Sequence, residues 1–207
     1  MEFFDPRLAK QCLTCFYKKR EFGARSIIVL LMLMHFIING VVNGETQNMF
    51  LFQRAKLGWD IDTSTYHSVF GIVVGLIGTL LMIGVFSKYL KISDIILTIV
   101  STVLTLISRF VYSIVTTTIG FFTGTAIDFT FSVKLLTVRS LVSKLVPIED
   151  LSTMFAVMGL FEAFAGVVFP WVYPTYYQYL LSDPTRDISE MFMMSAGLML
   201  IALITYS

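Results

Sequence analysis

Charged and hydroxyl side chains interrupt the long apolar run from Gly120 to Val146. They are Asp128, Ser132, Lys134 and Arg139. A charge at the depth of the lipid hydrocarbon costs at least about 2.5 to 3.5 kcal/mol, so such residues usually face a polar cavity and mark a pathway for a solute or an ion. These four residues are therefore the first candidates for a substrate or proton pathway.

Helical geometry predicts how these side chains point if residues 118–142 form one continuous helix. Asp128, Ser132 and Arg139 then fall within an arc of about 80°. Asp128 and Arg139 are about 16 Å apart along the axis, which is too far for a direct ion pair. Lys134 points about 120° away from Asp128 and is expected to face a different neighbour. The alternative to a pathway is a structural ion pair that locks the helices together.

Two further carboxylates, Glu45 and Glu162, lie inside other apolar segments. Glu45 follows a run of Asn and Gly residues at 39–44, which predicts a loosened helix whose polar side chains line a cavity. The alternative for Glu45 is a position at the membrane interface. Glu162 lies midway along its segment and is the predicted partner of Lys134 or Arg139. Because burial disfavours a charged carboxylate, Glu162 is also the preferred proton carrier, ahead of Asp128 and Glu45.

The composition is that of a membrane protein. Of the 207 residues, 56% are hydrophobic and 14% are charged, whereas soluble domains carry roughly 25% charged residues. The net charge of +1 argues against nucleic acid as a partner, because nucleic-acid binders usually carry a basic face. The sequence contains no Gly-rich phosphate loop, no HExxH motif and no nucleophile elbow. We therefore expect neither enzyme activity nor a cofactor or metal.

Six apolar segments are long enough to cross the bilayer, which takes about 20 helical residues. They are residues 26–52, 68–86, 94–115, 118–142, 151–180 and 188–207. Most connectors between them are short, which favours antiparallel neighbours in one bundle. The predicted fold is an all-α polytopic membrane protein, with six transmembrane helices in residues 26–207. Residues 1–25 are predicted to form a cytoplasmic juxtamembrane segment, either amphipathic on the membrane surface or a disordered linker.

The distribution of basic residues predicts the orientation of the chain. Cytoplasmic loops of membrane proteins carry an excess of Lys and Arg. With a cytoplasmic N-terminus, the inner side holds Arg7, Lys10, Lys18, Lys19, Arg20, Arg25, Lys88, Lys91 and Lys144, and the outer side holds Arg54, Lys56 and Arg186. Both termini are therefore expected in the cytoplasm. Arg109 lies within the third apolar segment, and we expect it to reach the outer interface by extending its side chain.

Several stretches of this sequence resemble a known family. They are NGETQNMFLFQRAKLGW, SKYLKISD and VRSLVSKLVPIEDLSTMFAVMGLFEAFAGVVFPWVYPTYYQYL. Together they are similar to the proton-coupled folate transporter family (solute carrier family 46) of the major facilitator superfamily. The likeness is strongest over residues 138–180. Arg139 matches that family's tenth-helix arginine, which is implicated in proton coupling and substrate binding.

The resemblance implies a function and a set of partners. Family members have two six-helix halves, and this chain resembles the C-terminal half with part of the central loop. The implied function is half of a secondary active transporter, a symporter that moves a small organic anion with protons across a plasma or endolysosomal membrane. The implied partners are the solute, protons, the lipid bilayer and an N-terminal six-helix half. The alternative is a non-transporting membrane protein, either a truncated product or an accessory subunit.

Overall fold

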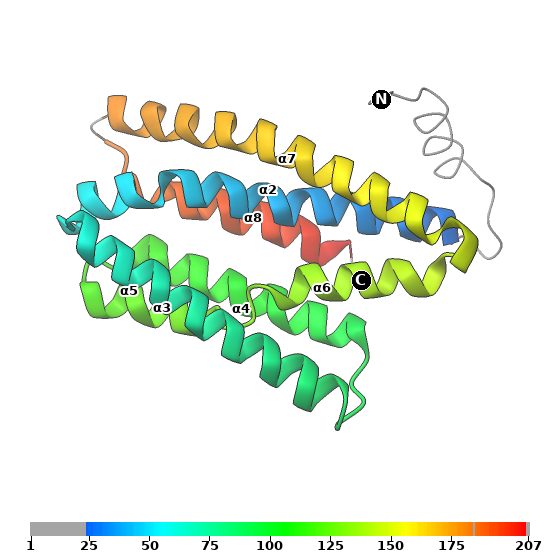
Figure 1. Cartoon of the computed structure of the whole chain (residues 1–207). Coiled ribbons are helices and arrows are strands. Elements are labelled where there is room, and N and C mark those ends of the chain that lie inside the picture. The colour runs from blue at the N-terminus through cyan, green and yellow to red at the C-terminus, as the bar shows by residue number, and fades with distance from the viewer. Residues whose placement is uncertain (1–23, 184, 206–207) are drawn as a thin grey trace, which may run out of the picture.

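All regular secondary structure in the described part of the chain is helical. A computed structural model describes residues 24–183 and 185–205, which contain seven α-helices (Figure 1). The predicted juxtamembrane segment lies almost wholly outside these residues. The helices are α2 (Ala24–Leu57), α3 (Ile61–Thr79), α4 (Asp94–Ile114), α5 (Thr118–Ile127), α6 (Val133–Leu145), α7 (Ile148–Ser182) and α8 (Glu190–Ile204). A π-helical stretch, η2 (Leu80–Ser87), continues α3.

Four of the helical stretches are long and apolar enough to cross a membrane. They are Arg25–Leu57, Ile61–Ser87, Asp94–Ile114 and Ile148–Ser182. Two further apolar helices, α5 and α8, are shorter. The predicted all-α fold with several membrane helices is thus confirmed, as expected of a multi-pass integral membrane protein.

The prediction of one continuous helix over residues 118–142 is wrong. α5 ends at Ile127 and α6 begins at Val133, and residues 128–132 form turns between them. Within this break the amide of Phe131 bonds to the carbonyl of Asp128, and the amide of Val133 bonds to that of Thr130. These short-range bonds replace the helical ones, so angles counted at 100° per residue do not carry across the break.

Local sequence signals set several helix ends. α2 ends before Gly58, which has a φ of 65° and whose amide bonds to the carbonyl of Arg54. Only glycine takes this left-handed conformation without strain, and it commonly follows a helix. Asp60 then caps α3 by accepting a hydrogen bond from the amide of Thr63 at 3.0 Å. Hydrogen bonding to Thr63 holds the pKa of Asp60 below its usual value.

The helices pack side by side, with α2 lying most extensively on α7 and α4 packing on α8, α6 and α5. Two glycines allow the close approach of α2 and α7. A Cβ atom on Gly40 or Gly44 would lie 2.3 Å from the ring of Phe169 or Tyr173, respectively. The aromatic rings of α7 therefore rest directly on the backbone of α2, an arrangement typical of small-residue helix contacts.

The predicted loosening of the first apolar segment is not found, since α2 is continuous through residues 39–44. The side-chain amides of its Asn residues hydrogen-bond to backbone carbonyls of α2 itself. The Asn39 side chain donates to the carbonyl of His35 at 2.9 Å, and that of Asn43 donates to the carbonyl of Asn39 at 2.8 Å. These polar groups are satisfied locally, so they do not require an interrupted helix.

The two ends of the bundle carry different ion pairs. At one end Lys144, in the last turn of α6, lies 2.7 Å from Asp94 at the start of α4. At the other end Lys56 pairs with Asp187. Partial burial raises the pKa of Asp187, but hydrogen bonds from Lys56 and Ser189 outweigh it and hold that pKa below its usual value.

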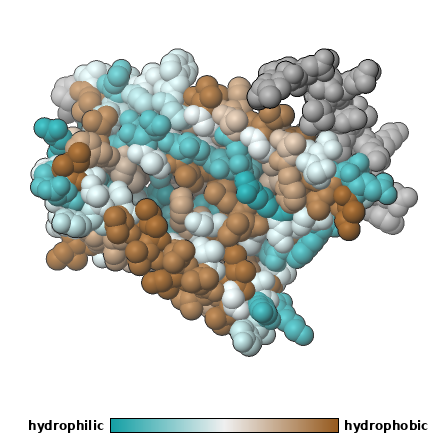
Figure 2. Space-filling model, viewed as in Figure 1, coloured by the Kyte–Doolittle hydropathy of each residue, from teal (hydrophilic) through white to brown (hydrophobic). Residues whose placement is uncertain are grey.

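A broad apolar surface covers α3 and η2. Figure 2 shows it as a brown band along the lower side of the molecule, whereas teal, hydrophilic residues run across the middle of the view and occur at the ends. The exposed apolar side chains of these two elements include Val69, Ile72, Val73, Leu76, Ile77, Leu80 and Leu81. Such a surface is compatible with lipid or protein, not with water.

A substitution at Gly78 tests the contact between α3 and the break. A Cβ atom on Gly78 would lie 1.9 Å from the carbonyl oxygen of Phe129, and a backbone atom cannot swing away as a side chain can. We expect Gly78→Ala to destabilise the protein by about 1 to 3 kcal/mol, as overpacking does. The measurement is thermal unfolding in detergent. The matched control is Gly75→Ala, where a Cβ atom would meet nothing within 4 Å. Equal unfolding temperatures for the two variants would contradict the contact.

Candidate functional site

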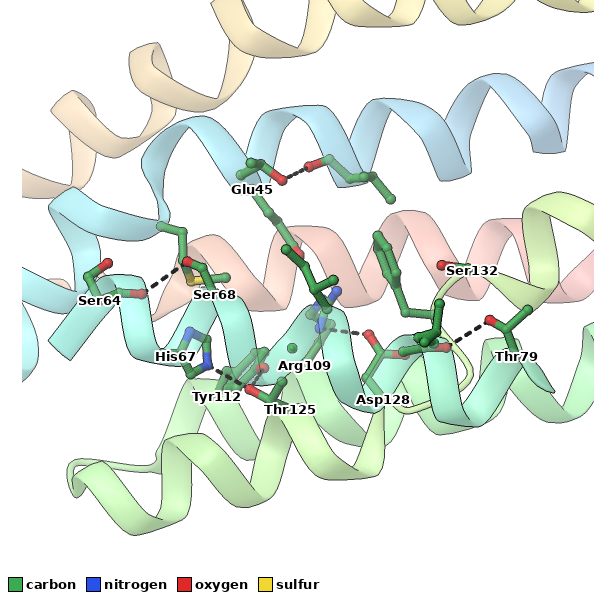
Figure 3. A pocket seen from close by; sticks show the side chains of 18 of the residues that line it. Glu45, Ser64, His67, Ser68, Thr79, Arg109, Tyr112, Thr125, Asp128 and Ser132 are labelled. Carbon is green, nitrogen blue, oxygen red and sulfur yellow. Dashed lines mark hydrogen bonds and ion pairs between the residues drawn. The ribbon is translucent and has the colours of Figure 1, made fainter. Parts of the chain in front are cut away.

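A cavity of about 680 Å³ lies between α2 and α3. The side chains of Glu45, Met49 and Phe50 line it from α2, and His67, Ser68 and Leu76 are among those from α3. Arg109 and Tyr112 of α4, Thr125 and Asp128 at the end of α5, and Phe131 and Ser132 of the break complete the lining (Figure 3). The break in the fourth apolar segment therefore forms part of the cavity wall.

Three charged side chains from three different segments meet in this cavity. Arg109 lies between two carboxylates, with its Nε 2.7 Å from Glu45 Oε1 and its Nη1 3.2 Å from Asp128 Oδ2. All three side chains are almost fully buried, with exposed fractions of 4 to 7%. Arg109 lines the cavity, so its guanidinium can contact a ligand that enters there.

The contact between Arg109 and Glu45 is close but poorly directed. Nε and Oε1 are near enough for an ion pair, yet the N–H bond does not point at the oxygen, and neither atom is hydrogen-bonded within the described residues. An arginine usually binds a carboxylate through two parallel hydrogen bonds. Arg109 and Glu45 therefore interact mainly through the attraction of their opposite charges and not through a directed hydrogen bond.

A fourth charge, Lys134, lies behind the cavity wall and is completely buried. Its Nζ donates to the Thr105 hydroxyl at 2.6 Å and lies 3.9 Å from Asp128 Oδ1. The same hydroxyl lies 2.6 Å from Asp128 Oδ1. Thr105 therefore bridges the ammonium of Lys134 to the carboxylate of Asp128.

The four charges of this cluster sum to zero, because Glu45 and Asp128 balance Arg109 and Lys134. Moving an ion from water to a low-dielectric interior costs several kcal/mol, and close opposite charges offset part of that cost. A neutral cluster is thus the arrangement in which four charges can lie inside a membrane bundle. Any ligand that brings a net charge changes this balance.

A second, separate set of ionisable groups includes Arg139, Glu162 and His35. Arg139 of α6 pairs with Glu162 of α7, and His35 Nε2 of α2 lies 2.6 Å from the same carboxylate oxygen. His35 is completely buried, whereas the side chains of Arg139 and Glu162 are 47% and 28% exposed. Glu162 thus joins α2, α6 and α7, and Arg139 keeps part of its guanidinium accessible.

An uncharged polar network lines the cavity beside Arg109. The Gln53 amide lies 3.0 Å from His67 Nδ1, and His67 Nε2 lies 2.6 Å from the Thr125 hydroxyl. The Tyr112 hydroxyl is 2.7 Å from the same Thr125 oxygen. This network presents hydroxyl groups next to the guanidinium, so the cavity offers both charge and hydrogen bonds to a solute.

The structure brings together some predicted residues and separates others. Asp128, Lys134 and Glu45 meet in one cluster, whereas Arg139 and Glu162 pair elsewhere. Ser132 lines the cavity but makes no capping hydrogen bond to α6. The expected pairing of Glu162 with Arg139 is found, and Glu162 does not pair with Lys134.

Two predictions about direction are wrong. Lys134 does not turn away from Asp128, because the break at residues 128–132 rotates α6 relative to α5 and returns Lys134 to the same neighbour. Arg109 does not reach the outer interface. It is 5% exposed and pairs inside the bundle, because two carboxylates there compensate its charge.

Sequence reasoning also missed Arg109, His35 and His67 as members of these sites. A signal for Arg109 is present in α4, where buried hydroxyl residues recur at helical spacing on one face. They are Thr98, Ser101, Thr102, Thr105 and Ser108. A polar stripe on a membrane helix faces other helices and not lipid, and Arg109 follows directly on it.

Comparison of the sequence with known protein families and with curated proteins gave no match.

Removal of Arg109 tests whether the cluster depends on this cation. We expect Arg109→Ala to destabilise the protein by about 3 to 5 kcal/mol, because it leaves two buried carboxylates with one cation. The double variant Arg109→Ala, Glu45→Gln should recover much of the loss, since it restores neutrality. The measurement is thermal unfolding in detergent, with Arg186→Ala as a surface control. An Arg109→Ala variant as stable as this control would contradict the cluster.

Proposed function

We propose that this bundle is one half of a secondary active transporter that moves a small organic anion together with protons. The observation that carries the proposal is the cavity in which Glu45, Arg109 and Asp128 meet. Intramembrane charges that face a cavity usually belong to a pathway for ions or solutes. Arg109 supplies the anion-binding group, because it lines the cavity and a guanidinium binds carboxylates and phosphates well.

Charge balance supports coupling to protons. The cluster of four charges is neutral when it is empty, so an anion alone would leave a net negative charge in a medium of low dielectric constant. A proton taken up by a carboxylate removes that imbalance, and the anion and the proton then bind together. For this role we propose Glu45 in place of Glu162, the carrier preferred from the sequence, because Glu162 pairs with Arg139 away from the cavity. Oε1 of Glu45 lies beside Arg109 without a hydrogen bond.

The proposal includes a second six-helix half. Solutes of major facilitator transporters bind between two halves near the middle of the membrane. The cavity described here is bounded by α2, α3, α4 and the break, and residues of α3 and η2 form an apolar surface beside it. The resemblance to the C-terminal half of the proton-coupled folate transporter family supports the same arrangement. In this proposal α5 and α6 act together as one broken span.

Arg139 has a separate place in the proposed function. The resemblance implies a part in proton coupling and substrate binding, and the pair with Glu162 supports this because it joins three helices and stays partly exposed. A change in the protonation of Glu162 would release Arg139 and His35 together. We propose that this second site regulates helix movement, while the cluster at Arg109 binds the solute.

The orientation of the chain is tested by glycosylation. With both termini in the cytoplasm, acceptor sites inserted near Asp62 and near Asp183 should be modified, because both positions face the lumen during membrane insertion. An acceptor near Lys91 should remain unmodified. The measurement is a shift in electrophoretic mobility that a glycosidase removes, and modification near Lys91 would overturn the topology.

Solute uptake tests the function itself. A set of labelled organic anions should be assayed with the full-length protein reconstituted in liposomes. Uptake should rise when the external medium changes from neutral to mildly acidic, because protons enter with the anion. Glu45→Gln should make the remaining uptake independent of pH, since an amide imitates the protonated carboxyl group.

The surface variant Glu190→Gln serves as the control and should keep the pH dependence of the wild type. Uptake that stays the same at both pH values in the wild type would refute proton coupling. Sequencing the transcript upstream of Met1 gives an independent check, because the proposal expects six further spans there.

A further inference from the structure

Asp128 lies between two cations and is held tightly by neither. Its Oδ2 is 3.2 Å from Arg109 Nη1, and its Oδ1 is 3.9 Å from Lys134 Nζ. A charge-assisted hydrogen bond between nitrogen and a carboxylate is normally about 2.7 to 2.9 Å long. A shift of roughly 1 Å by the Asp128 carboxylate would therefore exchange the contact with Arg109 for a direct bond to Lys134.

The backbone around Asp128 is suited to such a shift. Asp128 is the residue that ends α5, with φ of −84° and ψ of 32°, and the turns of residues 128–132 follow it. Its amide donates to the carbonyl of Gly124 at 3.2 Å, and its carbonyl accepts a local hydrogen bond from the amide of Phe131 at 3.0 Å. The last carbonyl groups of a helix have no intrahelical partner, so the backbone at this position is held by fewer hydrogen bonds than in the middle of a helix.

Thr105 provides hydrogen bonds for both positions of Asp128. Its hydroxyl lies 2.6 Å from Asp128 Oδ1 and 3.0 Å from the carbonyl oxygen of Ser101. A hydroxyl has one hydrogen, so it donates to only one of these acceptors at a time. When Asp128 bonds directly to Lys134, the Thr105 hydroxyl can turn to the carbonyl of Ser101, so this hydroxyl keeps a hydrogen-bond acceptor.

The position of Lys134 needs a reason, because a buried ammonium is costly and this one does not line the cavity. Within the described residues, Asp128 is the carboxylate that lies within 4 Å of it. Resting on the proposed function, we infer that Lys134 is a positioning residue. When an anion binds to Arg109, Lys134 forms a direct ion pair with Asp128 in place of the contact between Asp128 and Arg109. The anion then meets a guanidinium freed from Asp128, and Asp128 keeps a cation.

A binding measurement on the purified full chain in detergent tests this inference. The probe is benzoate, a carboxylate whose ring suits the Phe50, Tyr112 and Phe131 side chains of the cavity, and benzyl alcohol is its uncharged control. Lys134→Met removes the second cation and keeps the bulk of the side chain. We expect its affinity for benzoate to fall about tenfold or more per folded molecule, because the anion must then displace Asp128 without a replacement partner.

Two further variants separate the exchange of partners from a purely structural role. Asp128→Asn combined with Lys134→Met should recover at least the wild-type affinity, because the side chain at position 128 then carries no charge that competes with the anion for Arg109. Thr105→Val keeps all four charges and should weaken binding by a smaller factor, which preserves the test if Lys134→Met does not fold. Lys144→Met, at an exposed ion pair far along α6, is the matched control and should bind as the wild type does.

The inference is overturned if Lys134→Met binds benzoate as tightly as the wild type, or if the double variant stays as weak as Lys134→Met. A wild-type protein that does not bind benzoate overturns it as well. The proposed function fails by a different result, namely uptake that does not depend on pH. A protein with pH-dependent uptake and an unaffected Lys134→Met variant would retain the function and lose the exchange.

Discussion

Two cations and two carboxylates share the interior of this bundle, and their mutual compensation constrains how the helices can be arranged. Each charge alone would carry a cost of several kcal/mol inside a membrane protein. Arg109 lies within reach of both Glu45 and Asp128, while Lys134 reaches Asp128 through Thr105. α2, α4, the end of α5 and the start of α6 must therefore approach one another at a single depth. The cavity lies beside this point and is lined by residues of α2 and α3.

The remaining packing adapts to this requirement. α5 and α6 are interrupted at residues 128–132, which places Asp128 and Lys134 on the same side, beside α4. Gly78 lets the backbone of α3 touch the break at Phe129. Gly40 and Gly44 bring α7 onto the opposite side of α2 through aromatic rings. Small residues thus bring the helices close together where the interior is apolar, and paired charges occupy the remaining polar space.

Much of the architecture could be predicted from apolar segments and connectors, because a stretch of about 20 apolar residues has few stable conformations in a bilayer. Residues 94–115, for example, were expected as a span and form α4 almost exactly over that range. The break after Ile127 could not be predicted, since it contains neither proline nor glycine and depends on the charge cluster and on contact with Gly78. Because the break could not be predicted, the predicted direction of the Lys134 side chain was wrong.

The sequence placed Arg109 at the interface, because a single sequence does not reveal which carboxylates lie near it. Asp128, Glu45 and Lys134 were recognised as candidates by their chemistry alone, while their partners required the fold.

Charged residues inside this bundle line a cavity, and water must reach that cavity if a solute is to bind there. Cysteine accessibility tests this most directly. After Cys12 and Cys15 are replaced by serine, a single cysteine is introduced at Thr46, which lines the cavity, or at Leu200, which is exposed on α8 away from it. The protein in intact membranes is then treated with a charged, membrane-impermeant thiol reagent. The account predicts rapid modification of Thr46→Cys and little modification of Leu200→Cys, because a thiol facing lipid stays protonated and unreactive. A Thr46→Cys variant as unreactive as Leu200→Cys from both sides of the membrane would contradict it.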